Sequence, residues 1–394
     1  MTPHSFFATC PRGLEEVLAR ELESCGARST RRTGGGVHFE GELAVCYRAN
    51  LHSRIASRIL WRVAEAPYAN EQDIYEAALR IAWPERFHGA RTIRVDVSAI
   101  RAPVKSLEFV TLRVKDAVCD RFRADTGARP DVDTRAPDVR IHAFLDAGTV
   151  TFYLDTSGEP LWKRGWRGRT GEAPIRENLA AGIIALTGWQ PGEPFLDPMC
   201  GSGTFLIEAA GIALELAPGS QRAFGFEKLA GFDATLWRRL RDEAQASERP
   251  RAPLPIHGSD LYGAELTQAR AAVEAAGLTG VVQLKQANVL ELPPPAPAGV
   301  LVANPPYGVR LGEEKALEAF YPKLGDALKA RFAGWRCYVF TADAVRFAKL
   351  VGLKASKRIP LYNGPLECRL LEYRIVAGPM RGKGSAAARQ DAAG

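Results

Sequence analysis

The sequence predicts an α/β protein whose carboxyl-terminal half forms a mostly parallel, doubly wound sheet and whose amino-terminal half forms two smaller α/β units. Two observations support this fold class. Short apolar runs alternate with helical stretches from residue 175 to about residue 377, which is typical of parallel strands joined by crossover helices. Ahead of them, the first 65 residues show the order β-α-β-β-α-β, and a second α/β pattern follows up to residue 158.

The amino-acid composition limits which classes of protein are possible. A chain of 394 residues, 46% hydrophobic and 25% charged, is ordinary globular material for two to four domains of roughly 100–200 residues each. The formal net charge of +7 favours a polyanionic partner. Seven cysteines are spread singly, which argues against a disulfide framework and a structural zinc site, so we expect no metal.

The amino terminus has no basic stretch followed by an apolar run, and nowhere do eighteen apolar residues follow one another. Both features argue against a secretory signal and a membrane span. We therefore expect a cytoplasmic protein without membrane contact; the sequence leaves its oligomeric state open.

The first unit, residues 1–65, is predicted to be ferredoxin-like. A strand begins at Ser5, and a helix with apolar residues at helical spacing follows until Gly26 ends it. A glycine-rich reversal at 34–36 separates two short strands, a second helix covers 43–51, and alternating residues from 55 to 63 indicate a half-buried strand. This β-α-β-β-α-β order defines the ferredoxin-like pattern.

The second unit, residues 66–158, is predicted to hold helices at 74–81 and 106–124 and strands at 93–98, 139–146 and 149–155. The long helix carries an apolar stripe and, on its other face, basic residues. A basic linker, 159–174, follows and includes WKRGWRGR. Its tryptophans and arginines favour RNA contact, because bases stack on such side chains; a solvated connector without a ligand is the alternative.

The third region, residues 175–380, supplies the parallel sheet. Its predicted strands are PFLD, LPIHGSD, VVQLK, GVLVAN and WRCYVFTA, and a final antiparallel pair covers 356–360 and 368–376. Residues 217–255 are rich in proline, glycine and charge and are interpreted as an insertion. The small, polar tail at 381–394 is predicted to be disordered.

A glycine loop joins an apolar strand to an apolar helix at residues 197–204, DPMCGSGT. Gly201 and Gly203 permit a tight turn, and free N–H groups at the helix start favour an anionic group. No lysine follows the glycines, and the third glycine of the dinucleotide fingerprint is missing. Asp197 suits an ammonium group, so the loop predicts an amino-acid-like ligand.

Asp260 ends the next predicted strand, at the same edge of the sheet. A carboxylate in this position typically accepts hydrogen bonds from ribose hydroxyls. It lies about sixty residues beyond the glycines rather than the usual ~20, a difference that the insertion accounts for. A helix-capping aspartate is the alternative interpretation.

The third motif, Asn304-Pro305-Pro306-Tyr307, follows a short apolar strand. Two prolines make a rigid corner without N–H donors, which leaves carbonyls and the asparagine side chain as acceptors. Asn304 Oδ1 and the Pro305 carbonyl suit the two N–H groups of an exocyclic amine, while Tyr307 suits stacking on a planar target. A simple proline turn is the alternative.

In order and spacing, the three motifs resemble the Rossmann-like, class I S-adenosylmethionine-dependent methyltransferases, whose N-P-P-Y members methylate amino nitrogens. The resemblance implies a seven-stranded sheet, S-adenosyl-L-methionine as the cofactor, and Asn304, Pro305, Pro306 and Tyr307 as catalytic residues. The residues that it implies around the cofactor are Asp197, Pro198, Cys200, Gly201, Ser202, Gly203, Asp260, Leu261, Asn288 and Asn304. Asn288 stands where the family usually has an acid near the adenine amine, and its amide oxygen still offers an acceptor.

The amino-terminal half narrows the family. Residues 6–27, 35–41, 129–145 and 154–167 resemble THUMP-containing RNA methyltransferases, in which a ferredoxin-like unit and a THUMP domain precede the catalytic domain. Residues 173–204 are similar to their catalytic entry segment. The likeness reaches to about residue 377 and is greatest to the first half of the bacterial 23S rRNA guanine-N2 methyltransferases. The activity of the second half of those fused enzymes is not expected.

The resulting hypothesis is a methyltransferase that modifies the exocyclic N2 of a guanine in RNA, with 23S rRNA first and transfer RNA second. The basic residues expected to contact RNA phosphates are Lys105, Arg113, Lys115, Arg121, Arg123, Lys163, Arg164, Arg167 and Arg169. DNA adenine-N6 and protein glutamine-N5 methyltransferases also use N-P-P-Y. A non-catalytic RNA-binding assembly factor is the alternative from another class.

Overall fold

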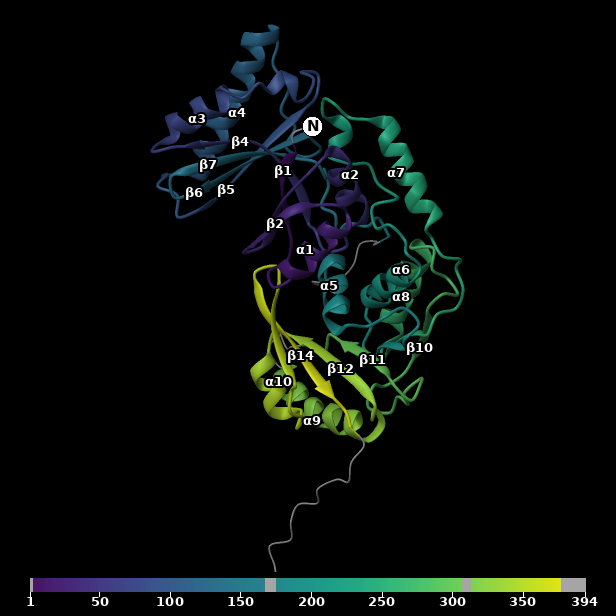
Figure 1. Ribbon diagram of the computed structural model, residues 1–394. Helices are drawn as coiled ribbons and strands as arrows, with labels where there is room; N and C mark the ends of the chain where they lie inside the picture. Colours follow the sequence, from purple (N-terminus) through teal and green to yellow (C-terminus); the bar gives the residue numbers. More distant parts are fainter. Residues whose placement is uncertain (1–2, 167–174, 307–312, 377–394) are drawn as a thin grey trace, which may run out of the picture.

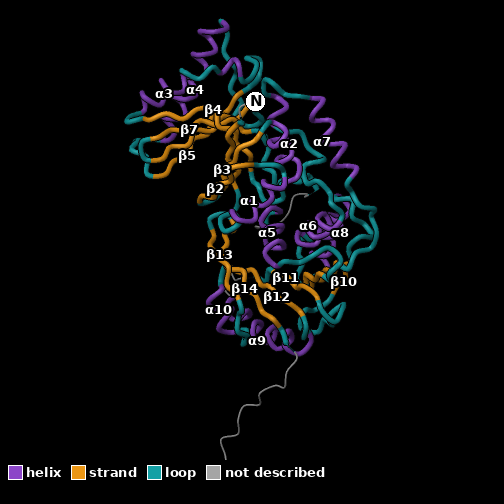
Figure 2. Tube along the Cα trace, viewed as in Figure 1, coloured by secondary structure: helices purple, strands orange, loops and turns teal. Residues whose placement is uncertain are grey.

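The computed structural model describes residues 3–166, 175–306 and 313–376. Within these ranges the chain forms two seven-stranded sheets, one in each half of the sequence. Figure 1 shows the amino-terminal sheet at one end of the molecule and the carboxyl-terminal sheet at the other, and Figure 2 shows the helices and loops that lie between them. The arrangement is the predicted α/β class.

The amino-terminal sheet has the order β2-β3-β1-β4-β7-β6-β5. Its strands are β1 (His4–Thr9), β2 (Arg28–Thr33), β3 (Gly36–Gly41), β4 (Arg58–Pro67), β5 (Ile93–Ile100), β6 (Val139–Asp146) and β7 (Thr149–Asp155). All neighbours are antiparallel except β5 and β6. The helices of this half are α1 (Glu15–Ser24), α2 (Leu43–His52), α3 (Glu71–Leu79), the short 3-10 helix η1 (Trp83–Glu85) and α4 (Leu107–Thr126).

Strand β4 joins the two predicted amino-terminal units into one sheet. Its first residues, from Arg58 to Trp61, pair with β1, and its residues from Leu60 to Pro67 pair with β7. Leu60 and Trp61 pair with both strands, and the ladder with β7 has a register shift between Arg62 and Ala64. The sequence predicted two separate units because the alternation in this segment shows a strand but not which strands lie on either side of it.

The carboxyl-terminal sheet has the order β10-β9-β8-β11-β12-β14-β13. Its strands are β8 (Phe195–Asp197), β9 (Ile256–Asp260), β10 (Gln283–Gln286), β11 (Gly299–Ala303), β12 (Trp335–Thr341), β13 (Lys357–Asn363) and β14 (Leu366–Arg374). The five strands from β10 to β12 are parallel, and β14 is antiparallel to both β12 and β13. This confirms the predicted, mostly parallel sheet and its antiparallel edge.

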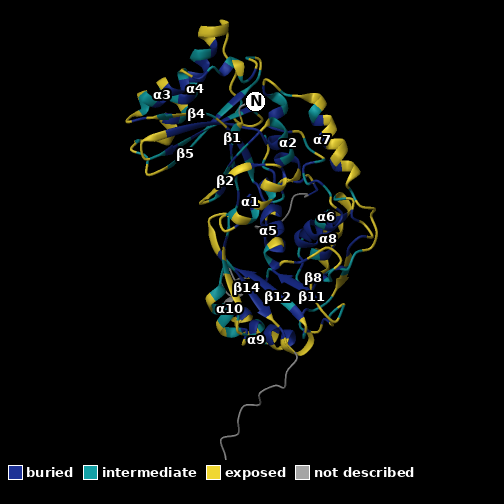
Figure 3. Ribbon diagram, viewed as in Figure 1, coloured by how far each residue is buried: buried dark blue, intermediate teal, exposed yellow. Residues whose placement is uncertain are grey.

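Helices cover both faces of this sheet (Figures 1 and 3). They are α5 (Glu177–Thr187), α6 (Thr204–Ala213), α8 (Gly263–Ala275), α9 (Glu313–Arg331) and α10 (Ala344–Leu350). Alternate residues of β11 face the two layers: Val300 and Val302 lie in the core of α5, α6 and α8, whereas Leu301 lies in the core of α9 and α10. Burial on both faces explains why these strands appear in the sequence as continuous apolar runs.

The predicted insertion contains the 3-10 helix η2 (Gly225–Lys228) and helix α7 (Ala234–Ala246), which packs against α2. Tyr47 of α2 stacks on Phe226, with ring centroids 4.3 Å apart, and Phe226 meets Trp237 of α7 edge-on at 5.0 Å. The insertion therefore connects the carboxyl-terminal half to the amino-terminal half. No helix in the described parts of the chain has the length and apolarity needed to span a bilayer.

Candidate active site

The order of the parallel strands reverses at β8, which lies between β9 and β11. Ligands of open α/β sheets bind outside the carboxyl ends of the strands at such a switch point. Asp197 ends β8, Asp260 ends β9, and Asn304 directly follows β11. The structure thus brings the three sequence motifs to one edge of the sheet.

The glycine loop has the conformation that its residues predict. Gly201 has φ +49° and Gly203 has φ +77°, a region that favours glycine. Cys200 N donates to the Ser259 carbonyl at 2.9 Å, which holds the loop against the end of β9. A Cβ on Gly201 would meet no atom within 4 Å, so the backbone there is open to a ligand.

Asp260 connects the first two motifs. Its Oδ2 accepts from Gly201 N at 3.0 Å and its Oδ1 accepts from Tyr262 N at 3.1 Å. Each carboxylate oxygen has further lone-pair positions for hydroxyl donors. Beside it, the side chains of Leu261 and Tyr262 are 51% and 66% exposed. A carboxylate next to exposed apolar surface suits a ribose with a flat base, and Tyr262 is a candidate that the sequence reasoning missed.

Asp197 is buried and accepts one hydrogen bond, from Met199 N to Oδ1 at 3.2 Å. Burial, together with the nearby negative charge of Asp260, raises the pKa of Asp197 to about 8. A carboxyl with this pKa needs a cation beside it to stay ionised at neutral pH. An ammonium group supplies that cation, so Asp197 fits the amino-acid part of the predicted cofactor.

Asn304 carries an unusual polar atom. Its Oδ1 is buried and has no hydrogen-bond partner among the described residues. Buried acceptors are nearly always paired in folded proteins, and an exception indicates a ligand or a functional role. Pro305 is buried and Pro306 is exposed, so the corner reaches from the interior to the surface. Tyr307 lies outside the described residues.

Tyr321 of α9 positions this corner, and the sequence reasoning missed it. The Tyr321 hydroxyl donates to the Pro306 carbonyl at 3.0 Å, and its side chain is fully buried. Burial raises the pKa of Tyr321 to about 12, so the hydroxyl keeps its proton. No local pattern marks this tyrosine, because its partner lies fifteen residues away in the sequence.

The remaining predicted cofactor residues lie around the same edge. Pro198, Cys200 and Ser202 belong to the glycine loop, and Ser202 Oγ lies 3.3 Å from Thr204 Oγ1. Asn288 follows β10, and its Oδ1 accepts from Leu290 N at 3.0 Å. This bond gives Asn288 a local structural role and leaves one lone-pair position on its oxygen for a ligand.

The predicted RNA-contact residues on α4 have acidic or polar neighbours. Arg121 Nε lies 2.6 Å from Asp125 Oδ2, Arg123 pairs with Asp120 at 3.0 Å, and Lys115 pairs with Asp116. The Arg113 guanidinium lies 4.1 Å from the centroid of the Tyr75 ring. Lys105 is exposed, and Lys163 Nζ lies 2.6 Å from Glu159 Oε2. The acidic partners on α4 offset the positive charge of its basic side chains, so the helix surface is less positive than those basic residues alone would make it. Arg167 and Arg169 lie outside the described residues.

The prediction for Arg164 is wrong. Its side chain is only 4% exposed, and its Nε lies 3.1 Å from Glu208 Oε1 on α6. The same guanidinium donates to the Leu161 carbonyl at 3.0 Å and to the Arg54 carbonyl at 2.8 Å. A guanidinium enclosed by these acceptors cannot reach an RNA phosphate from solvent, so Arg164 is an interior residue that ties the linker to α6.

Comparison with known proteins decides the family. Residues 164–372 match the RMKL-like methyltransferase domain. This chain belongs to that methyltransferase family. Residues 5–60 match the RlmL ferredoxin-like domain and residues 68–155 match the THUMP domain. Both confirm the fold class predicted for the amino-terminal half of this RMKL-like chain.

Individual relatives agree with the family. The chain is 44% identical over 391 residues to the ribosomal RNA large subunit methyltransferase K/L of Aeromonas salmonicida, a match that covers 94% of this chain and 54% of that protein. It is 38% identical over 375 residues to the putative RNA methyltransferase slr0064 of Synechocystis, covering 95% and 97% of the two chains. The chain thus spans about half the length of the Aeromonas relative.

A solved structure described as SMU.472, a putative methyltransferase complexed with SAH, superposes with a TM-score of 0.87. It is 32% identical, and the match covers 96% of this chain and 100% of that chain. At the level of the family, the cofactor of this RMKL-like methyltransferase is S-adenosylmethionine, as predicted.

Proposed function

We propose that this chain transfers a methyl group from S-adenosylmethionine to the exocyclic N2 of a guanine in RNA, with 23S rRNA as the first candidate substrate. Two features of the chain support an RNA substrate: the ferredoxin-like and THUMP domains that precede the catalytic domain, and the formal net charge of +7. The relatives named for ribosomal RNA and RNA methylation point the same way. An RNA substrate also implies a cytoplasmic protein.

The observation that carries the proposal is the unpaired Asn304 Oδ1 at the carboxyl end of β11. An exocyclic amine has two N–H groups, and Asn304 Oδ1 with the Pro305 carbonyl offers two acceptors on a rigid corner. Accepting both protons would orient the nitrogen lone pair away from the corner. Reaching this buried oxygen requires a base that is flipped out of its stack.

The cofactor residues would work as follows. Asp197 would hold the ammonium group of the cofactor, the loop from Cys200 to Gly203 would follow its amino-acid part with backbone, and Asp260 would accept from the ribose hydroxyls. Leu261 and Asn288 would lie at the adenine. S-adenosylmethionine supplies a methyl group on a sulfonium, which needs no acid to leave.

The catalytic contribution of the chain is therefore orientation. The amine nitrogen forms the new N–C bond as the S–C bond breaks with its electron pair on sulfur, and the extra amine proton then passes to solvent. Holding the two reacting groups in line supplies a large part of the rate enhancement in such reactions. No general base is required beside Asn304, and the neutral Tyr321 only keeps the corner in place.

The proposal is tested by incubating the protein with methyl-labelled S-adenosylmethionine and either unmodified 23S rRNA or unmodified transfer RNA, followed by nucleoside analysis. Labelled N2-methylguanosine is the expected product, and the RNA that carries it identifies the substrate. Labelled N6-methyladenosine would overturn the assignment of the base. RNA binding without cofactor binding would favour a non-catalytic assembly factor.

A further inference from the structure

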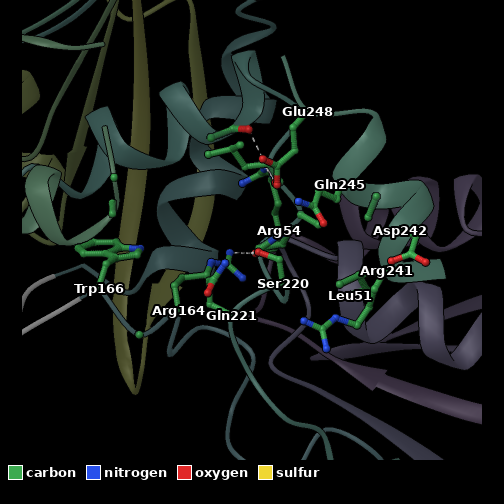
Figure 4. A pocket seen from close by; sticks show the side chains of 18 of the residues that line it. Leu51, Arg54, Arg164, Trp166, Ser220, Gln221, Arg241, Asp242, Gln245 and Glu248 are labelled. Carbon is green, nitrogen blue, oxygen red and sulfur yellow. Dashed lines mark hydrogen bonds between the residues drawn. The ribbon is translucent and has the colours of Figure 1, made fainter. Parts of the chain in front are cut away.

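A cavity of about 990 Å³ lies between the linker, α2, α6 and the insertion helix α7. Figure 4 labels lining side chains from the linker, α2 and α7. Its volume lies in the range of pockets that hold small organic ligands. Nothing in the proposed methyl transfer uses this cavity.

The cavity is separate from the active site. It is lined by Ile207, Glu208 and Gly211 of α6 and by the carboxyl end of α8 at residues 275–278. The cofactor motifs lie at the amino ends of the same helices. At a rise of 1.5 Å per residue, the end of α8 at Ala275 lies about 18 Å from its start at Gly263.

The floor of the cavity contains the buried guanidinium of Arg164 and the partly buried guanidinium of Arg54, which share the carboxylate of Glu208. Arg164 Nε lies 3.1 Å and Arg54 Nη1 lies 3.6 Å from Glu208 oxygens. A second buried carboxylate, Glu21, lies near Arg54, but its oxygens accept from Ser53 Oγ and from two backbone N–H groups. The Arg54 guanidinium also donates to the Gly211 and Leu216 carbonyls, so both guanidinium groups are already bonded and two carboxylates balance their charge. Figure 4 labels Arg54 and Arg164 among the lining residues. The floor is therefore a closed structural network, which leaves the rim as the part of the cavity able to bind a ligand.

The rim adds exposed cations. Arg238, Arg241 and Arg251 line the cavity, and none of them has a carboxylate within 4.0 Å among the described residues. Three further lining acids, Glu227, Asp242 and Glu248, oppose them in charge. Arg238 and Arg241 are three residues apart on α7, a spacing that places their Cβ atoms about 5–6 Å apart on one helix face. The Arg241 guanidinium also lies 5.9 Å from the centroid of the Trp237 ring.

We propose that the arginine rim of this cavity binds phosphate groups of the substrate RNA, at a place distinct from the pocket for the target base. Two exposed arginines one turn apart on α7, with Arg251 beyond the end of that helix, suit successive phosphates of a strand better than a single small anion. The inference rests on the proposed function, because it takes the substrate to be RNA. The arginine rim would also provide an RNA contact that α4, most of whose basic residues are paired with acids, does not provide.

The test compares two double variants that remove the same charge. Arg238→Gln/Arg241→Gln alters the rim, and Arg239→Gln/Arg249→Gln alters exposed arginines outside the cavity, paired with Glu243 and Glu215. Binding to unmodified 23S rRNA is measured by filter binding from about 50 to 200 mM salt. We expect the rim variant to bind about tenfold more weakly, and its log–log salt slope to decrease by about 0.7 for each RNA phosphate that the variant no longer neutralises.

A third variant tests the sign of the effect. Asp242→Asn/Glu248→Gln removes two of the opposing charges and should tighten RNA binding. Equal binding and equal salt slopes for the rim variant and its matched control would overturn the inference. The inference would also be overturned if the cavity bound a free nucleotide instead of RNA. In that case AMP would raise the melting temperature of the wild type but not of the rim variant, and AMP would not compete with RNA for binding.

Methyl transfer measured on the same proteins separates this inference from the proposed function. If the wild type binds RNA through the rim but labels no guanine, the proposed function fails and the cavity assignment stands. If the wild type labels guanine while the rim variant binds RNA like its control, the function stands and the cavity assignment fails.

Discussion

The glycine loop and the proline corner lie at the same sheet edge but differ in how their polar atoms are satisfied. Around the glycine loop, Asp260 at the end of β9 accepts from two backbone N–H groups, and Asp197 at the end of β8 accepts from one. At the proline corner, Asn304 Oδ1 is buried without a partner among the described residues, and the corner is held instead by Tyr321 through the Pro306 carbonyl.

The difference teaches how the site divides its roles. The carboxylates of the glycine loop shape the backbone before any ligand arrives, so that the loop is pre-organised. The corner separates the two tasks: Tyr321 supplies the positioning, and Asn304 keeps its acceptor for the amine. Leaving a buried acceptor unpaired costs about 1–3 kcal/mol, which a bound amine would recover.

The largest expected effect comes from removing the free acceptor. Asn304→Ala should lower the rate of methyl transfer about 10²–10³-fold, the loss typical of deleting one pre-organised polar group at a reacting centre. The melting temperature should stay close to that of the wild type, because Asn304 Oδ1 bonds no described residue, and the rate should decrease more than cofactor affinity does. Single-turnover kinetics measure the rate, and calorimetry measures cofactor affinity and melting temperature. Asn363→Ala, on β13, is the control. A wild-type rate in the Asn304 variant would remove the assigned role.

The second effect concerns Asp197 and pH. Its folded-state pKa of about 8 lies above the ordinary value of 3.8, so binding an ammonium group must ionise it. The cofactor dissociation constant should therefore decrease as pH rises from about 6 to 8, by up to about tenfold per unit, with proton release on binding. Titration calorimetry in buffers of different ionisation enthalpy measures that release.

Asp197→Asn should abolish this pH dependence, whereas Asp233→Asn, which changes the cap of α7, should preserve it. The same raised pKa predicts a stability effect with a definite sign. The folded state holds the proton that the unfolded state has already lost above about pH 4. The free protein should therefore become less stable as pH rises from about 4 towards 8, and the decrease should be smaller with cofactor present.

The smallest effect separates positioning from binding. Tyr321→Phe removes one neutral hydrogen bond, worth about 0.5–1.5 kcal/mol, so kcat should decrease roughly two- to tenfold while cofactor affinity is unchanged. Tyr373→Phe is a matched control, since Tyr373 is equally buried and its hydroxyl has no partner among the described residues. If both variants reduce kcat equally, the hydroxyl of Tyr321 has no specific role.

Two neighbouring basic residues of the linker look equivalent in the sequence but differ in burial in the structure. Lys163 and Arg164 were both predicted to contact RNA, yet Lys163 is 52% exposed and Arg164 is 4% exposed. A basic side chain in a basic run carries no local sign of its surroundings. The acceptor that encloses Arg164 is Glu208, 44 residues further along the chain, and only the packing of the linker on α6 brings them together.

The sequence by itself determined the features that depend on neighbouring residues. Apolar periodicity determined the strands and helices, Gly201 and Gly203 determined the left-handed turn, and two consecutive prolines determined a corner without donors. The tertiary structure decided everything that depends on distant partners. It joined two units through β4, buried Arg164, assigned Tyr321 to the Pro306 carbonyl and left Asn304 Oδ1 unpaired. The physical reason is that backbone conformation is governed by local sterics, whereas burial and pairing are properties of contacts between segments far apart in the chain.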